Sequence, residues 1–132
     1  MANILSLLEL NALVREAIEI AMPNAYWVEA ELADVRDNGH CYMELLQKDS
    51  CSNTPVARAR ATCWRNVWTY VRPRFERVTG QRLRAGMKVL LQVHASFHEN
   101  YGFSWQVEDI DPDYTLGDMA VSYTHLTLPT IR

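Results

Sequence analysis

The sequence of 132 residues has few cysteines and no metal-binding motif. Its three cysteines, Cys41, Cys51 and Cys63, are odd in number, and their spacing matches no zinc site. Such a set predicts neither a disulfide framework nor a bound zinc ion. We therefore expect a cytoplasmic protein, because thiols stay reduced in that compartment.

Long hydrophobic runs are also missing. The first apolar stretch, residues 4–22, is interrupted by charged and polar side chains such as Glu9 and Arg15. A secretory signal and a membrane span both need a continuous apolar segment. The sequence therefore predicts no signal peptide and no membrane partner.

Motifs of catalysis are scarce as well. The five glycines are scattered without forming a phosphate-binding loop, and no G-x-S-x-G sequence marks a nucleophile. His94 and His98 share a strand but lack further metal ligands, and Cys63 falls on a predicted core face. Glu29 and Glu31 lie two apart on an exposed strand, where acids are usually solvated. We expect no catalytic residue, no metal and no cofactor in this chain.

Charge is plentiful but unevenly distributed, although the net charge is only −3. Residues 55–88 contain nine Lys and Arg and a single acid, Glu76, whereas nine of the 16 acids precede residue 50. A local basic surface can bind a polyanion even when the whole chain is acidic. For residues 72–84, a solvated helix face is the alternative.

Hydrophobic periodicity begins with a helix. Apolar residues recur at spacings of three and four over residues 5–22, and Ser6 with Glu9 fits a capping box. From residue 26 the period changes to two, which predicts strands, and Asn38-Gly39 is a strong hairpin signal. The predicted strands are residues 26–37, 40–46, 56–64, 87–98 and 103–110, with a bulge near Ile110.

A second helix is expected over residues 66–79, between the third and fourth strands. Asn66 can cap its start, Gly80 suits its end, and Pro73 should kink or divide it. Five antiparallel strands with a helix in this position are the layout of an OB-fold Greek-key barrel, an α+β fold. The predicted parts are an N-terminal helix packed on the barrel (1–25), the OB-fold domain (26–114) and a linker start with a tail (115–132). Residues 121–132 do not continue the two-residue periodicity of the strands, and they resemble a translated cloning adapter.

The ligand groove of an OB barrel crosses its second and third strands and is flanked by the loops after the first and fourth strands. In that position this sequence has cationic and aromatic side chains. Arginines neutralise phosphates, and aromatic rings stack on unpaired bases. The expected residues are Arg58 and Arg60 for phosphates, Arg36 and Lys48 for steering, Tyr42 and Tyr101 for stacking, and His40 and Thr62 for other groove contacts.

A purely structural role is the alternative for several of these side chains. Arg58 and Arg60 can pair across strands with acids such as Glu44, and Tyr42 can simply cover the barrel. From the residues alone, a nucleic-acid interface and an ordinary barrel surface both remain open.

Six segments, taken together and in order, resemble the N-terminal domain of the large subunit of bacterial exodeoxyribonuclease VII. They are LELN (8–11), WVEAEL (27–32), GHCY (39–42), RATCW (60–64), GMKV (86–89) and VEDIDP (107–112). The matching residues are Trp27, Gly39, His40, Tyr42, Arg60 and Trp64.

The resemblance implies an OB-fold domain that binds single-stranded DNA for a nuclease. In that family the hydrolytic residues lie in a later domain, and small subunits bind a C-terminal helical region. Residues 49–55 and 65–85 are longer and more arginine-rich than the usual form, which leaves open whether the added helix contacts DNA or another domain. The alternatives are a docking module that uses the Trp68 and Phe75 helix, and an RNA-binding barrel.

Overall fold

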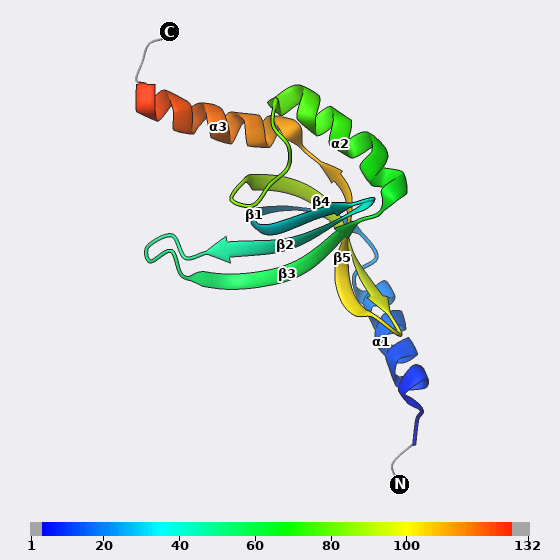
Figure 1. Ribbon diagram of the computed structural model, residues 1–132. Helices are drawn as coiled ribbons and strands as arrows, with labels where there is room; N and C mark the ends of the chain where they lie inside the picture. Colours follow the sequence, from blue (N-terminus) through cyan, green and yellow to red (C-terminus); the bar gives the residue numbers. More distant parts are fainter. Residues whose placement is uncertain (1–3, 128–132) are drawn as a thin grey trace.

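Strands with alternating apolar and polar residues close into a five-stranded barrel in the computed structural model, which describes residues 4–127 (Figure 1). The order around the barrel is β1-β2-β3-β5-β4. This confirms the predicted α+β OB-fold, with one helix before the barrel and one between the third and fourth strands. The elements are α1 (Leu7–Ala21), β1 (Ala25–Asn38), β2 (His40–Lys48), β3 (Pro55–Cys63), α2 (Arg65–Thr79), β4 (Lys88–His98), β5 (Gly102–Ile110) and α3 (Pro112–Thr127).

The barrel closes because β1 is long enough to pair with two strands. Its first half pairs with β4 and its second half with β2, and the register shifts between Leu32 and Asp34. A short parallel contact between β3 and β5 completes the ring. In β5, Glu108 is the extra residue of a bulge, since Val107 and Asp109 pair with adjacent residues of β4. The bulge predicted near Ile110 is thus confirmed.

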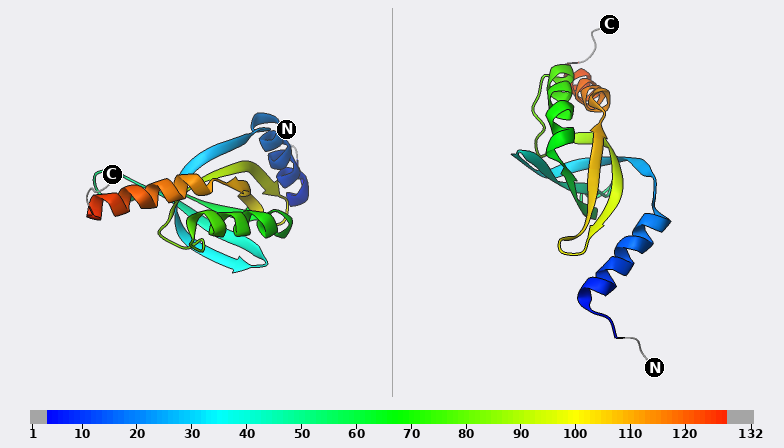
Figure 2. Two further views of the ribbon diagram at one scale, coloured as in Figure 1. Left: turned by 90° about the horizontal axis from the view of Figure 1, so that it is seen from above. Right: turned by 90° about the vertical axis from the view of Figure 1, so that its right-hand side faces the viewer.

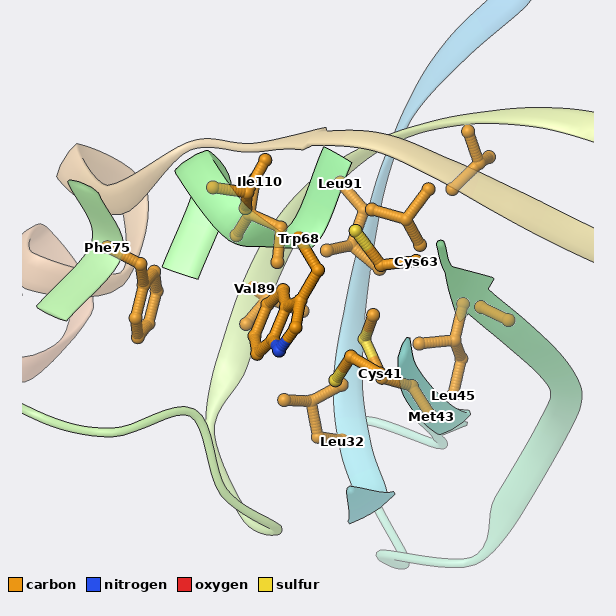
Figure 3. Close-up of a cluster of buried hydrophobic side chains, with 14 of the residues drawn as sticks. Leu32, Cys41, Met43, Leu45, Cys63, Trp68, Phe75, Val89, Leu91 and Ile110 are labelled. Atoms are coloured by element: carbon orange, nitrogen blue, oxygen red, sulfur yellow. The ribbon is translucent and has the colours of Figure 1, made fainter. Parts of the chain in front are cut away.

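The core lies between the barrel wall and α2 (Figure 3). Trp68, Val71 and Phe75 of α2 are buried against inward side chains of the strands. Removing such apolar surface from water is the main favourable term in folding. Trp68 and Phe75 therefore belong to the chain's own core, and neither ring is accessible to a docking partner.

Strand β3 departs from its expected alternation. Ala61 and Cys63 are buried as predicted, but Ala57 is exposed and Ala59 is only half-buried. In the described structure β3 meets β5 only at Ala61 and Thr62, so the earlier half of the strand extends beyond the closed barrel. Thr62, expected to face outward, is 9% exposed because it lies at this junction.

Helix α2 is continuous through Pro73 and starts earlier than predicted. Pro73 is tolerated because it lies on the exposed face of the helix, where water can solvate the freed carbonyl. Its N-cap is Trp64 instead of Asn66. The imidazole of His40 accepts a hydrogen bond from the backbone amide of Arg65 at 2.8 Å, which satisfies a donor at the helix start. Gly80 ends the helix at φ 71°, as expected.

Helix α1 projects from the barrel beside β4 (Figures 1 and 2). Its predicted capping box is present, with the Glu9 amide 3.1 Å from Ser6 Oγ and the Ser6 amide 2.8 Å from Glu9 Oε1. Asn11 and Arg15 hold the helix to Glu99, each through a 2.8 Å hydrogen bond. None of its residues is buried. Within residues 4–127, no helix is long and apolar enough to cross a membrane.

Residues 115–127, where a linker and tail were expected to begin, belong to helix α3. Asp111 Oδ1 accepts a 2.9 Å hydrogen bond from the Asp113 amide, and Pro112 occupies the first turn, where proline is favoured. Thr115 is buried and donates to the Lys88 carbonyl at 2.9 Å, which fixes α3 to β4. Residues 128–132 of the adapter-like tail lie outside the described residues.

Replacing Phe75 tests how far α2 stabilises the barrel. Phe75→Ala should lower the free energy of unfolding by about 3–5 kcal/mol, because a large buried ring is lost and a cavity remains. Urea denaturation measures the change. Tyr70→Ala on the exposed face of α2 is the matched control, with an expected effect within about 0.5 kcal/mol. Equal effects of the two substitutions would contradict this packing.

The cysteines should differ sharply in reactivity. Cys41 and Cys63 are buried opposite one another on β2 and β3, and burial raises the pKa of each to about 12. Near pH 8 their thiolates are therefore rare, whereas Cys51 is exposed. Iodoacetamide should modify only Cys51 in the folded protein and all three cysteines after unfolding. Rapid native labelling of a Cys51→Ser variant would refute this.

Candidate nucleic-acid interface

A groove of about 900 Å³ lies between strands β2 and β3 on one side and the β4–β5 hairpin on the other. The end of β1 forms one margin and Trp64, at the start of α2, forms another. Polar and aromatic side chains alternate along it. Among the residues predicted to bind, Arg36, Tyr42, Arg60, Thr62 and Tyr101 line this groove.

Four aromatic side chains of the groove remain accessible to a ligand. The exposed fractions are 41% for Tyr42, 40% for Trp64, 76% for Tyr101 and 37% for Phe103. Tyr101 stacks on His98 with ring centroids 4.7 Å apart. Half-exposed rings of this kind can stack on flat ligands without rearrangement of the core.

Sequence reasoning missed Trp64 and Phe103 as candidate groove residues. Two-residue periodicity puts Phe103 on the same face of its strand as Trp105, and the two rings touch edge to face at 5.2 Å. The β4–β5 hairpin extends past the closed part of the barrel, however, and its paired Phe97 and Phe103 therefore line the groove. The match of Trp64 to the resembled family was the one available signal for it.

The cations of the groove are paired to different degrees. Arg36 is bound to Asp34 at 3.1 Å on the exposed end of β1. Arg60 is exposed and forms no ion pair within residues 4–127, although Glu44 stands opposite it on β2. Glu44 instead pairs with Arg58 at 3.9 Å. Arg60 is therefore available to an anion, whereas Arg36 and Arg58 are engaged by acids.

His40 lies beside the groove and orients its neighbours. Its Nδ1 accepts the amide hydrogen of Arg65, so its ring contacts Trp64 and Tyr42 edge to face at centroid distances of 5.0 and 6.2 Å. Because Nδ1 is an acceptor here, the neutral ring carries its proton on Nε2. The expected donor role is thus limited to Nε2, and His40 does not line the groove itself.

Two further predicted residues lie away from the groove. Lys48, at the far end of β2, pairs with Glu31 at 3.2 Å. Arg58 borders a separate apolar pocket of about 300 Å³ near Trp27. The tertiary structure therefore does not bring Lys48 and Arg58 together with Arg60.

Arginines of the basic middle segment also hold α2 on the barrel. Arg72 pairs with Asp37 and with Glu76, each at 3.0 Å, and the hydrogen bond that Arg72 donates to Glu76 raises the pKa of Arg72. Arg74 pairs with Asp109 and donates to the Ile110 carbonyl at 2.8 Å. Asp37 also accepts the indole N–H of Trp68 at 3.1 Å. Within residues 4–127, no three His, Cys, Asp or Glu side chains gather as metal ligands.

Comparison with known proteins identifies the class. Residues 5–111 match the family of OB-fold nucleic acid binding domains, and because the match covers most of the chain, the chain belongs to this family. Along its length it is also 41% identical over 121 residues to the exodeoxyribonuclease 7 large subunit of Deinococcus radiodurans. That alignment covers 89% of this chain but 29% of the relative, so the chain spans less than a third of that subunit. The resemblance found in the sequence is confirmed.

The hairpin between β1 and β2 depends on Gly39. Its φ is +86°, and a Cβ at this position would stand 2.7 Å from Arg65 Nη2. Gly39→Ala should therefore lower the free energy of unfolding by about 1–2 kcal/mol, measured by urea denaturation. Gly117→Ala is the control, because Gly117 lies in α3 with open space around it and alanine favours a helix. A Gly39 variant as stable as the unmodified protein would contradict the predicted strain.

Proposed function

We propose that this chain binds single-stranded DNA in the groove between β2–β3 and the β4–β5 hairpin. The observation that carries the proposal is the row of accessible aromatic rings in a groove that also contains Arg60, a cation without a protein partner among the described residues. A single strand offers the two complementary features, unpaired bases with free π-faces and a charged backbone. A duplex hides its bases and offers only the second.

The groove residues take distinct roles in this proposal. Arg60 contacts a phosphate. Arg36 contributes a second positive charge by contacting the strand in addition to Asp34, its ion-pair partner. Tyr42, Trp64 and Tyr101 stack on successive bases. Stacking does not depend on base identity, so binding should tolerate any sequence.

The remaining predicted residues act less directly. His40 positions Trp64 and Tyr42 through its ring contacts, and Thr62 forms part of the groove floor. Lys48 and Arg58 make no direct contact with the strand in this proposal, because Lys48 is paired with Glu31 and Arg58 with Glu44.

The relative suggests the wider setting. We propose that the chain is the N-terminal part of an exodeoxyribonuclease VII large subunit, acting in the cytoplasm, which presents single-stranded DNA to a nuclease domain outside this sequence. The chain itself then contributes binding and no catalytic residue. Its partners are single-stranded DNA, the remaining domains of the large subunit and, through them, the small subunits.

Fluorescence anisotropy of a labelled oligothymidylate tests this function. We expect saturable binding at low salt that duplex DNA of any sequence displaces poorly and that RNA of matched sequence displaces less well than DNA. Arg60→Ala should flatten the dependence of log affinity on log salt by about 0.7, the value for one phosphate contact on a single strand. Tyr42→Ala should weaken binding by about 1–3 kcal/mol.

Lys88→Ala provides the charge control, because Lys88 is exposed on the barrel away from the groove. It should leave both affinity and salt slope close to those of the unmodified chain. Equal slopes for the Arg60 and Lys88 variants would remove Arg60 from the interface. Absence of binding at every soluble concentration would reject the proposed function and favour a docking role.

A further inference from the structure

Helix α2 carries a second row of exposed cationic and aromatic side chains outside the groove. Asn66, Tyr70, Pro73 and Arg77 follow one another at spacings of three and four, so they lie on one face of the helix. All four are exposed, and Tyr70 has 65% of its surface accessible. A tyrosine exposed to this extent contributes nothing to the core of the chain, whose side of α2 is formed by other residues.

This face continues directly from the groove. Trp64 lines the groove and is also the N-cap of α2. The guanidinium of Arg65 lies over Gly39, at the turn beside the groove margin. Seen from the right-hand side in Figure 2, α2 rises above the barrel from the end of β3. A strand that leaves the groove past Trp64 therefore reaches the start of α2.

The arginines of α2 divide into two sets according to their partners. Arg72 and Arg74 are neutralised by Asp37, Glu76 and Asp109, and they hold the helix to the barrel. In contrast, within residues 4–127 the exposed Arg65 and Arg77 of the same helix form no ion pair.

The segment that contains these arginines has no acid left to neutralise them. The one acid between residues 55 and 88 is Glu76, and it is already bound to Arg72. Unpaired cations on a folded surface attract a polyanion. The aromatic ring among them distinguishes a strand with unstacked bases from a merely acidic protein surface.

We infer that the exposed face of α2 extends the DNA path beyond the groove, past Arg65 at the start of the helix, with Arg77 on a phosphate and Tyr70 stacked on a base. The inference rests on the proposed function of the groove. At 1.5 Å per residue, Arg65 and Arg77 stand about 18 Å apart along the helix, which adds room for several nucleotides. The helix thereby lengthens the stretch of single-stranded DNA that the chain can bind.

A length series of oligothymidylates separates the two parts of the track. One oligonucleotide has about 6 nucleotides and the other about 16, within the range that single OB-folds bind. The Tyr70→Ala/Arg77→Ala variant should bind the longer strand at least about tenfold more weakly than the unmodified chain and lose about 0.7 in salt slope. Its affinity for the shorter strand, measured by competition, should stay unchanged.

Conservative replacements and the charge control complete the design. Tyr70→Phe/Arg77→Lys should restore long-strand binding, because it keeps the ring and the charge, and Lys88→Ala should have no effect. Thermal unfolding checks that every variant is folded. Unchanged long-strand affinity in the double variant would overturn the α2 track, and equal weakening of both lengths would overturn it too. If the unmodified chain binds neither strand, the proposed function of the groove fails instead.

Discussion

Insertion of α2 into one end of the barrel fixes the positions of the β1–β2 hairpin, His40 and Trp64, on which the groove depends. Trp68 fills the space among the inward side chains and donates its indole N–H to Asp37, which Arg72 also binds at 3.0 Å. Asp37 stands one residue before the Asn38-Gly39 turn, so the same contact that seats the helix also holds the hairpin of β1 and β2. Buried polar groups satisfied in this way restrict the fold to one arrangement.

That arrangement reaches the groove through His40. Its ring accepts the amide of Arg65 at the start of α2 and touches Trp64 and Tyr42. The two aromatic residues come from different elements, a helix cap and a strand, and only the seated helix brings them to one side of the barrel. The binding surface is thus a consequence of helix packing as much as of the strands that carry it.

The packing of α2 also determines which arginines are neutralised by acids. The chain is acidic overall, yet it keeps unpaired arginines on one side because its acids are placed against the arginines that fasten α2. Each acid at the helix–barrel junction removes a cation from the surface and leaves those further out free. A negative net charge and unpaired surface arginines are therefore compatible in one small domain.

Local chemistry let the sequence determine the elements and their order. Ser6 and Glu9 set the start of α1, and Asn38-Gly39 set the hairpin. Alternation of apolar and polar residues along β2 put Cys41 and Met43 in the core. Each of these signals acts within a few residues. The layout of strands and helices was then enough to predict the barrel, and five of the residues predicted to bind line the groove.

The tertiary structure alone decided which of those residues are free to act. Thr62 is buried because β3 pairs with β5 there. Phe103 lines the groove because the β4–β5 hairpin extends past the closed part of the barrel. Lys48 lies at the end of β2, beyond Glu44, which stands opposite Arg60, and Arg60 is unpaired because Glu44 pairs with Arg58. Such outcomes depend on contacts between residues far apart in the chain, and periodicity within one segment carries no information about them.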